Sequence, residues 1–307
     1  MILIANEEAE AGIYLAADML KNKHAGIDAL VEAISLVEKS EKVRSVGFGG
    51  WPNILGEMEF DASVMNGDTL ETGAVGALKG ILPAAKVAKA VMQNLSHQIL
   101  VGEGATLFAK EMGFAEENTL MPDSKAKWQA TLKAHLTEEE LKNFPNIKLY
   151  EKQQLIQDPE RVRDTTVFLC VDAAQTANTA SSTSGWAWKY PGRLGDAPIC
   201  GAGFYADSRF GAVACTHTGE MTIRAATSNT IINALRHGHS LNDAVEIGIS
   251  DLRRLKTGYL GGVVIHAIDK FGNYKVANFR CGKDVNYWYW SPELEKPELR
   301  VAKQIKT

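Results

Sequence analysis

The sequence predicts a mixed α/β protein in which two stacked β-sheets lie between two helical layers. Each half of the chain contains both helical and strand-like segments, and no internal repeat or low-complexity tract divides it. Amphipathic helices and half-buried sheets must each cover an apolar face, and a layered sandwich does this for both. At 307 residues the chain fits one large layered domain, so we expect a single domain spanning residues 1–307.

In the first half, helices come first and a hairpin follows. Helices are predicted at 12–21, 27–38, 83–95 and 104–112. The first two have apolar residues at three- and four-residue intervals, Pro83 suits the first turn of the third, and glycines flank the fourth. Strands at 57–65 and 69–78 flank Asn66-Gly67-Asp68. Asn-Gly is a strong hairpin signal because both central residues of the tight turn take positive φ.

A polar stretch at 116–159 separates the two halves, and we interpret it as a partly helical surface excursion that leads to Thr165. The second half opens with a strand at 166–171, whose continuous apolar run suggests burial on both faces. The remaining elements are predicted in this order: a turn at 172–178, a strand at 183–190, helices at 220–236 and 241–255, and strands at 262–268 and 274–278.

Composition excludes several classes of function. Hydrophobic content is 45%, charged content is 23% and the net charge is −4, with no basic stripe of the kind that nucleic acid requires. No window approaches the roughly 20 apolar residues of a membrane helix. The short apolar run at Met1 to Ala5 is too little for a signal peptide, so we expect a cytoplasmic protein. The four cysteines lack C-x-x-C spacing, so we expect neither a zinc site nor a disulfide framework.

Chemistry is indicated first by Arg163-Asp164-Thr165-Thr166, which directly precedes the apolar strand. Threonine is a poor nucleophile, but as the first residue of a chain it has its own α-amine as a base. An α-amine titrates near pH 8 and can accept a proton, which an internal backbone N–H cannot do. Thr165 therefore becomes a candidate nucleophile if the preceding peptide bond breaks. Its alternative interpretation is an ordinary strand threonine.

A second segment, Gly192-Arg193-Leu194-Gly195-Asp196, contains the groups that a small zwitterionic substrate needs. An arginine fork matches a carboxylate through two parallel hydrogen bonds, and a nearby aspartate can receive an ammonium group. Arg193 and Asp196 could thus hold opposite ends of one amino acid. Taken alone, the same pair could equally be a surface ion pair of little energetic value.

The chain resembles the N-terminal-nucleophile hydrolases of the asparaginase-2 type, and glycosylasparaginase more than the isoaspartyl peptidases. Aspartate before the threonine is the glycosylasparaginase form, whereas isoaspartyl peptidases usually have glycine there. Ordered matches run through nearly the whole chain. They are Arg44 to Gly50, Asp61 to Met65, Gly73 to Val75, His97, Leu100 to Glu103, Asp164-Thr165, Ser182 to Gly185, Gly192 to Ile199, Gly201 to Gly203 and Gly219-Glu220.

The resemblance implies a four-layer αββα sandwich that cleaves itself into an α-chain, 1–164, and a β-chain, 165–307. Thr165 would attack the carbonyl of Asp164 in the precursor and the side-chain amide of an asparagine derivative in the mature enzyme. The implied substrates are of the glycosylasparagine type. The implied enzyme needs no metal or organic cofactor and is a homodimer of cleaved protomers.

The resemblance also assigns roles around the nucleophile. Thr183 matches a threonine that supports it by hydrogen bonding, and Thr216 matches a residue of the oxyanion hole. Arg193 and Asp196 match the residues that bind the α-carboxylate and the α-amine of the substrate. His217 stands in the substrate site, where the family has the glycine whose backbone N–H completes the oxyanion hole.

The sequence departs from the family pattern close to these positions. Arg163 replaces the usual histidine, Val167 and His217 replace glycines, and Asn6 stands at about the place of a tryptophan that lines the family's pocket. Histidine adopts positive φ less readily than glycine, so the oxyanion donor could shift. Two alternatives remain open: an isoaspartyl peptidase or L-asparaginase with the same nucleophile, and an uncleaved, inactive binding scaffold.

Overall fold

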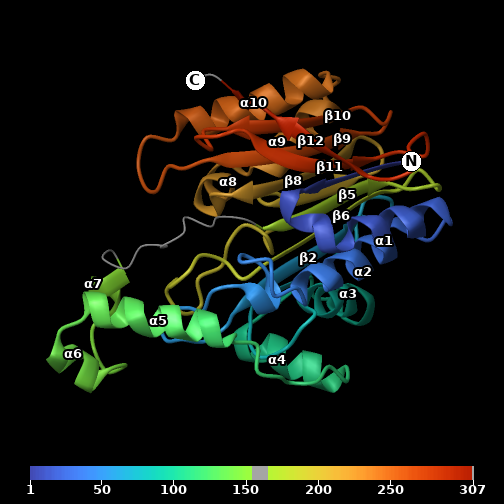
Figure 1. The fold of residues 1–307 in the computed structure, drawn as a ribbon. Helices are drawn as coiled ribbons and strands as arrows, with labels where there is room; N and C mark the ends of the chain where they lie inside the picture. The colour runs from blue at the N-terminus through green and yellow to red at the C-terminus, as the bar shows by residue number, and fades with distance from the viewer. Residues whose placement is uncertain (154–164, 306–307) are drawn as a thin grey trace.

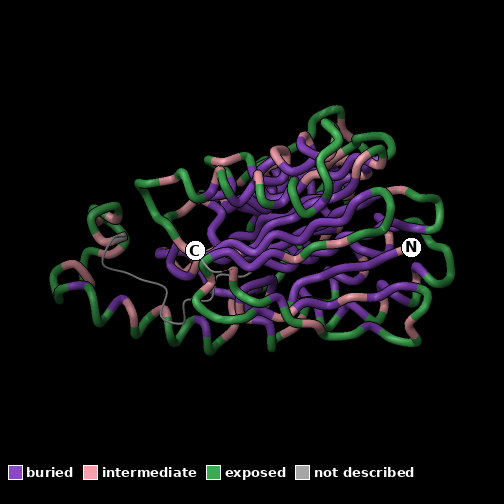
Figure 2. Tube along the Cα trace, turned by 90° about the horizontal axis from the view of Figure 1, so that it is seen from above, coloured by how far each residue is buried: buried purple, intermediate pink, exposed green. Residues whose placement is uncertain are grey.

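The computed structural model describes residues 1–153 and 165–305. Two β-sheets stack face to face, and helices cover the outer face of each (Figure 1). The buried strands run through the centre of the molecule, and the exposed segments lie around them (Figure 2). The four-layer αββα sandwich is therefore confirmed.

The larger sheet has eight strands in the order β12-β11-β1-β5-β6-β2-β3-β4. The bounds are β1 Ile2–Asn6, β2 Phe60–Asn66, β3 Thr72–Leu78, β4 Ile99–Val101, β5 Thr166–Val171, β6 Ala177–Thr183, β11 Val285–Trp290 and β12 Glu298–Ala302. Its outer face packs against α1 Glu10–Lys21, α2 Gly26–Glu38, α3 Ala84–Asn94 and α4 Gly102–Glu111. Short 3-10 turns lie at Glu7–Ala9 and Gly47–Gly49.

The smaller sheet has the order β13-β10-β9-β8-β7. Its strands are β7 Phe204–Asp207, β8 Gly211–His217, β9 Val263–Asp269, β10 Tyr274–Phe279 and β13 Gln304–Ile305. It is covered by α8 Gly219–Ala225, α9 Thr227–Arg236 and α10 Leu241–Arg254. Between the sheets, Ile4 and Leu169 of the larger sheet pack with Val264 and Ile268 of the smaller one. This shared core holds β5 of the larger sheet against β8 and β9.

The polar excursion forms α5 Pro122–His135, α6 Glu138–Asn143 and α7 Leu149–Gln153, which extend away from the sandwich (Figure 1). Trp128 anchors α5 by donating from its indole Nε1 to the carbonyl oxygen of Ile54 at 2.9 Å. The expectation of a partly helical surface segment is confirmed up to residue 153, and its remainder lies outside the described residues. No helix in the described ranges is long and apolar enough to cross a membrane.

Two sequence predictions are wrong in this region of the fold. The strand placed at 183–190 lies earlier, as β6, and residues 184–190 form a loop in which Gly185 and Trp188 have positive φ. The helix placed at 220–236 breaks at Ala226, which has φ 46° and divides α8 from α9. Burial also varies among the cysteines: Cys170 and Cys215 are buried, whereas Cys200 is exposed.

A buried carboxyl group beneath β6 makes stability depend on pH. Glu38 is fully buried, and burial raises its pKa to about 7, although Ser182 and the backbone of Ala85 donate hydrogen bonds to it. A raised pKa means that the folded state binds this proton more tightly than the unfolded state. The contribution of protonated Glu38 to the free energy of unfolding is therefore complete below about pH 4.5 and is lost as the pH rises through about 7.

We expect Glu38→Gln to remove that loss, because the amide stays neutral at every pH. Thermal or urea unfolding between pH 5 and 8 should show a shallower pH dependence for the variant than for the parent. The difference should reach up to about 3 kcal/mol at pH 8. Equal slopes for both proteins would show that Glu38 does not titrate in this window.

Candidate active site

The β5–β6 hairpin brings the candidate nucleophile next to Thr183. Thr165 directly precedes β5, Thr183 ends β6, and the antiparallel register pairs Thr166 with Ser182. A narrow pocket of about 10 Å³, room for about one water molecule, lies at this end of the hairpin. It is lined by Thr165, Thr183, Gly185, Trp186, Arg193, Gly195, Asp196, His217 and Gly219.

Most of the predicted site residues therefore meet in one pocket, which we call the clamp pocket. Thr216 is an immediate neighbour of its lining residue His217 but faces an adjoining cavity. Asp164, and with it the predicted cleavage point on its carboxyl side, lies outside the described residues, as does Arg163.

Asn6 fixes the main chain on both sides of the nucleophile position. Its Nδ2 donates to the carbonyl oxygen of Thr165 at 2.7 Å, and its Oδ1 accepts from the N–H of Val167 at 3.0 Å. Asn6 is buried at the end of β1, which pairs with β5. The sequence analysis placed Asn6 at about the position of the family's tryptophan and did not predict this role. The signal in the sequence that could have indicated it is an asparagine directly after an apolar run.

Arg193 lies in the clamp pocket with its guanidinium group oriented by two neighbours. Its Nε and Nη2 donate to the same oxygen of Glu220, at 3.0 and 2.7 Å, and its plane covers the Trp186 ring at 4.6 Å. Because these contacts use only part of the five-donor fork, other N–H groups remain for a substrate carboxylate. The sequence did not indicate that Glu220 and Trp186 would orient the Arg193 guanidinium group.

Asp196 is the buried acidic partner in the clamp pocket. It is 3% exposed, and its carboxylate accepts from the Thr222 hydroxyl at 2.5 Å. Burial raises its pKa to about 6, against the lowering effects of the Thr222 hydrogen bond and the Arg193 charge. A Cβ at Gly219 would come within 2.9 Å of the Asp196 carboxylate, so only glycine leaves this acid its space.

Two buried acids, Asp61 in β2 and Glu59 just before it, hold the loop that presents Arg193. Asp61 accepts from the N–H groups of Gly195, at 3.0 Å, and Ala77, at 2.9 Å. Glu59 accepts from the N–H of Gly192 at 3.1 Å and forms a buried ion pair with Lys189 at 3.9 Å. The loop is thus tied to β2 by charge-assisted hydrogen bonds, which are stronger than neutral ones.

The end of β8 places Thr216 and His217 beside this pocket. Thr216 is 1% exposed, and its hydroxyl lies 3.0 Å from Nδ1 of His217. His217 has φ 84°, the left-handed region that favours glycine. The backbone here therefore keeps a glycine-like conformation although a histidine occupies the position.

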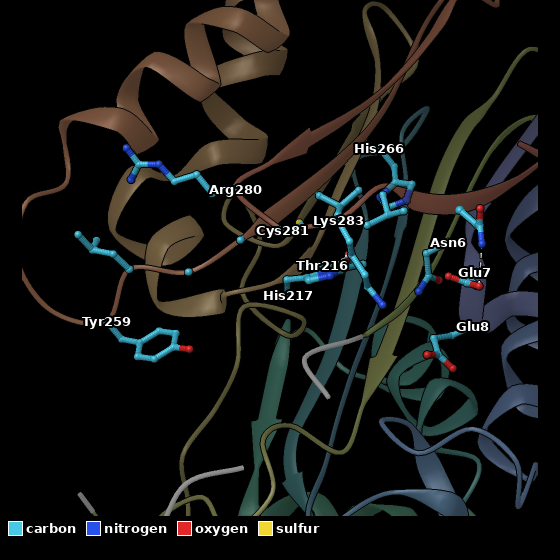
Figure 3. Close-up of a pocket in the computed structure, with 17 residues that line it drawn as sticks. Asn6, Glu7, Glu8, Thr216, His217, Tyr259, His266, Arg280, Cys281 and Lys283 are labelled. Carbon is cyan, nitrogen blue, oxygen red and sulfur yellow. Dashed lines mark hydrogen bonds between the residues drawn. The ribbon is translucent and has the colours of Figure 1, made fainter. Parts of the chain in front are cut away.

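A larger cavity of about 770 Å³ adjoins the clamp pocket, and His217 lines both spaces. Figure 3 shows its walls: Asn6, Glu7 and Glu8 on one side, and Thr216, His217 and His266 along the strands of the smaller sheet. His266 is buried, and this burial together with nearby His217 lowers its pKa to about 3, so its ring is neutral at pH 7. A polar cavity of this size can receive a group much larger than ammonia.

No cluster of three or more histidine, cysteine or acidic side chains suited to a metal occurs within residues 1–153 and 165–305. The polar groups of the clamp pocket instead suit organic ions. Arg193 supplies donors for an anion, and Asp196 supplies acceptors for a cation.

Comparison with known proteins finds relatives that are named as asparaginases. A Drosophila persimilis protein named "Putative N(4)-(beta-N-acetylglucosaminyl)-L-asparaginase" is 34% identical over 268 residues, which are 81% of this chain and 69% of the relative. The "Plant-type L-asparaginase" of Pyrococcus horikoshii is 35% identical over 283 residues, 91% of this chain and 88% of the relative. The profile of the family described as Asparaginase matches residues 6–290, and the chain belongs to this family of asparaginase-2 amidohydrolases.

Proposed function

We propose that the protein is an amidohydrolase that cleaves the β-amide bond of asparagine derivatives with Thr165 as an N-terminal nucleophile. The observation that carries this proposal is the meeting of Thr165 with Arg193 and Asp196 in one pocket. A nucleophile and an amino-acid clamp are separated by about thirty residues in the sequence and are brought together by the fold. This placement favours a nucleophile over an ordinary strand threonine, which needs no ion-binding side chains beside it.

The nucleophile first has to be released. In the continuous chain the Thr165 hydroxyl attacks the carbonyl carbon of Asp164, and the C–N bond breaks to give an ester and a free Thr165 amine. Water then hydrolyses the ester, which leaves the Asp164 carboxylate at the end of the α-chain and regenerates the hydroxyl. Asn6 supports this step by holding the main chain from Thr165 to Val167.

In the cleaved enzyme, the α-amine of Thr165 takes the hydroxyl proton as the oxygen attacks the substrate's side-chain amide carbon. Arg193 binds the α-carboxylate, and Asp196 binds the α-ammonium group. Thr216 and the backbone N–H of His217 stabilise the tetrahedral oxyanion. The proton passes to the leaving nitrogen, a β-aspartyl ester remains on Thr165, and water releases aspartate. Thr183 supports the nucleophile.

The large cavity beside His217 supports a bulky leaving group, because ammonia would need almost none of its space. We propose glycosylasparagine-type substrates, in agreement with the name of the Drosophila relative. Cleavage of β-aspartyl peptides or of asparagine itself is the alternative. The second alternative is an uncleaved binding scaffold.

A panel of three substrates with one common aspartyl part tests the substrate class. Cleaved enzyme should release aspartate from N4-(β-N-acetylglucosaminyl)-L-asparagine with at least about tenfold higher kcat/KM than from L-asparagine, a difference of about 1.4 kcal/mol. A β-aspartyl dipeptide is the third substrate. If it exceeds the glycosyl substrate, the leaving-group assignment is wrong while the nucleophile assignment stands.

The family resemblance also leads us to propose a homodimer of cleaved protomers. Sedimentation of the purified protein measures the mass of the assembly, and a mass of one chain pair alone would contradict this part of the proposal.

A further inference from the structure

His217 is held beside Thr216 by a hydrogen bond that the family's glycine could not make. The Thr216 hydroxyl and the His217 Nδ1 atom lie 3.0 Å apart at the end of β8. Figure 3 shows both side chains at the wall of the large cavity, and His217 also lines the clamp pocket. The imidazole therefore stands where the two spaces meet, next to the hydroxyl that would stabilise the oxyanion.

The direction of this hydrogen bond decides what Thr216 can do. A threonine hydroxyl has a single hydrogen, and an imidazole Nδ1 either donates or accepts. If Nδ1 accepts, the hydroxyl hydrogen is used on His217 and cannot reach a substrate oxygen. If Nδ1–H donates to Oγ1, the hydroxyl hydrogen is available for the oxyanion.

We propose that His217 is a positioning residue, which donates from Nδ1–H to Thr216 and thereby directs the Thr216 hydroxyl hydrogen toward the oxyanion. This inference rests on the proposed function of Thr216. No proton is transferred in this arrangement. Negative charge on the substrate oxygen strengthens both hydrogen bonds of the chain, from imidazole to hydroxyl and from hydroxyl to oxyanion. Because that charge develops in the transition state, the effect should raise kcat more than it lowers KM.

The neighbourhood of His217 allows this direction. His266 is buried beside it and stays neutral, so it adds no competing charge. The positive φ of His217 leaves its backbone N–H in a glycine-like position, so one residue can present a backbone donor and a side-chain donor together. These two contributions can be separated experimentally, because glycine keeps the backbone conformation and loses only the imidazole.

The test compares His217→Gly, His217→Asn and Thr216→Val in fully cleaved enzyme, with rates expressed per cleaved site. Removing one oxyanion donor costs about 10²- to 10³-fold in kcat, so misdirecting one by His217→Gly should cost about tenfold, with KM changed less than about twofold. Asparagine tolerates positive φ, and its amide can place a donor near the Nδ1 position. His217→Asn should therefore recover kcat to within about threefold of the parent.

A double variant shows whether His217 acts through Thr216. In the Thr216→Val background, His217→Gly should have no further effect on kcat, because the hydroxyl that it positions is gone. Gln175→Gly is the matched control: Gln175 also has positive φ, 65°, but lies in the exposed turn at the opposite end of the β5–β6 hairpin. It should leave kcat unchanged.

The outcomes separate this inference from the proposed function. An active parent with an undiminished His217→Gly variant overturns the positioning role alone. If His217→Gly costs as much in the Thr216→Val background as in the parent, the role is also overturned, because His217 would then act independently. A parent that is neither cleaved nor active overturns the proposed function, and the inference with it.

Discussion

Thr165→Ala should abolish both self-cleavage and amide hydrolysis. Alanine has no hydroxyl to attack either the preceding peptide carbonyl or a substrate amide, and without cleavage no α-amine becomes available as the base. We expect a single uncut chain and a fall in kcat of at least about 10⁴-fold. Gel electrophoresis reports the cleavage, and release of aspartate reports the hydrolysis.

The adjacent threonine supplies the matched control. Thr166 is buried, and its hydroxyl has no hydrogen-bond partner among the described residues, so Thr166→Val removes a hydroxyl at nearly constant volume without losing a bond seen there. This variant should fold, cleave and hydrolyse like the parent. Retained activity in Thr165→Ala would refute the nucleophile assignment, whereas loss of both functions in Thr166→Val would show that the Thr165 result reports only a disturbed strand.

Arg193→Ala should spare self-cleavage and raise KM by about 100-fold. The variant loses two charge-assisted hydrogen bonds to the substrate carboxylate, together about 3 kcal/mol, and leaves the negative Glu220 unpaired beside it. Arg193→Lys should restore little, because an ammonium group cannot reproduce the planar fork over Trp186. Steady-state kinetics on the cleaved proteins measures both effects.

An exposed arginine provides the comparison for charge alone. Arg209 is largely exposed and pairs with Asp207, which ends β7 in the smaller sheet. Arg209→Ala should change KM by less than about twofold. If Arg193→Ala shows an unchanged KM, Arg193 does not bind the substrate, and its pairing with Glu220 is merely structural.

The elements that the sequence predicted well have strong local patterns. The helix predicted at 27–38 corresponds to α2, because apolar residues recur on one helical face. The strand predicted at 166–171 is β5, because a short continuous apolar run is typical of a strand buried on both faces. Strand β6 was placed too late in the chain, and β8 was not recognised. β6 is buried but consists largely of serine, threonine and asparagine, and only Ala177 and Ala180 of its residues are apolar. No hydrophobic pattern can indicate such a strand.

The site shows the same division between local and distant information. Arg193 and Asp196 lie in one short segment, so the sequence alone indicated that they act together. Their link to Thr165 came from the family resemblance, and all three residues line one pocket. Their supports come from far along the chain: Glu220 and Thr222 belong to α8, and Asn6 ends β1. A sequence pattern does not reveal which buried polar groups will meet, because each hydrogen bond joins segments that only the tertiary fold brings together.

The intact mass of the purified, denatured protein shows whether the chain releases Thr165 as an N-terminal nucleophile. We expect two fragments, residues 1–164 and 165–307, in equal amounts and without any added protease. A single unbroken chain of 307 residues after prolonged incubation would contradict this role of Thr165, because Thr165 would then have no α-amine with which to act.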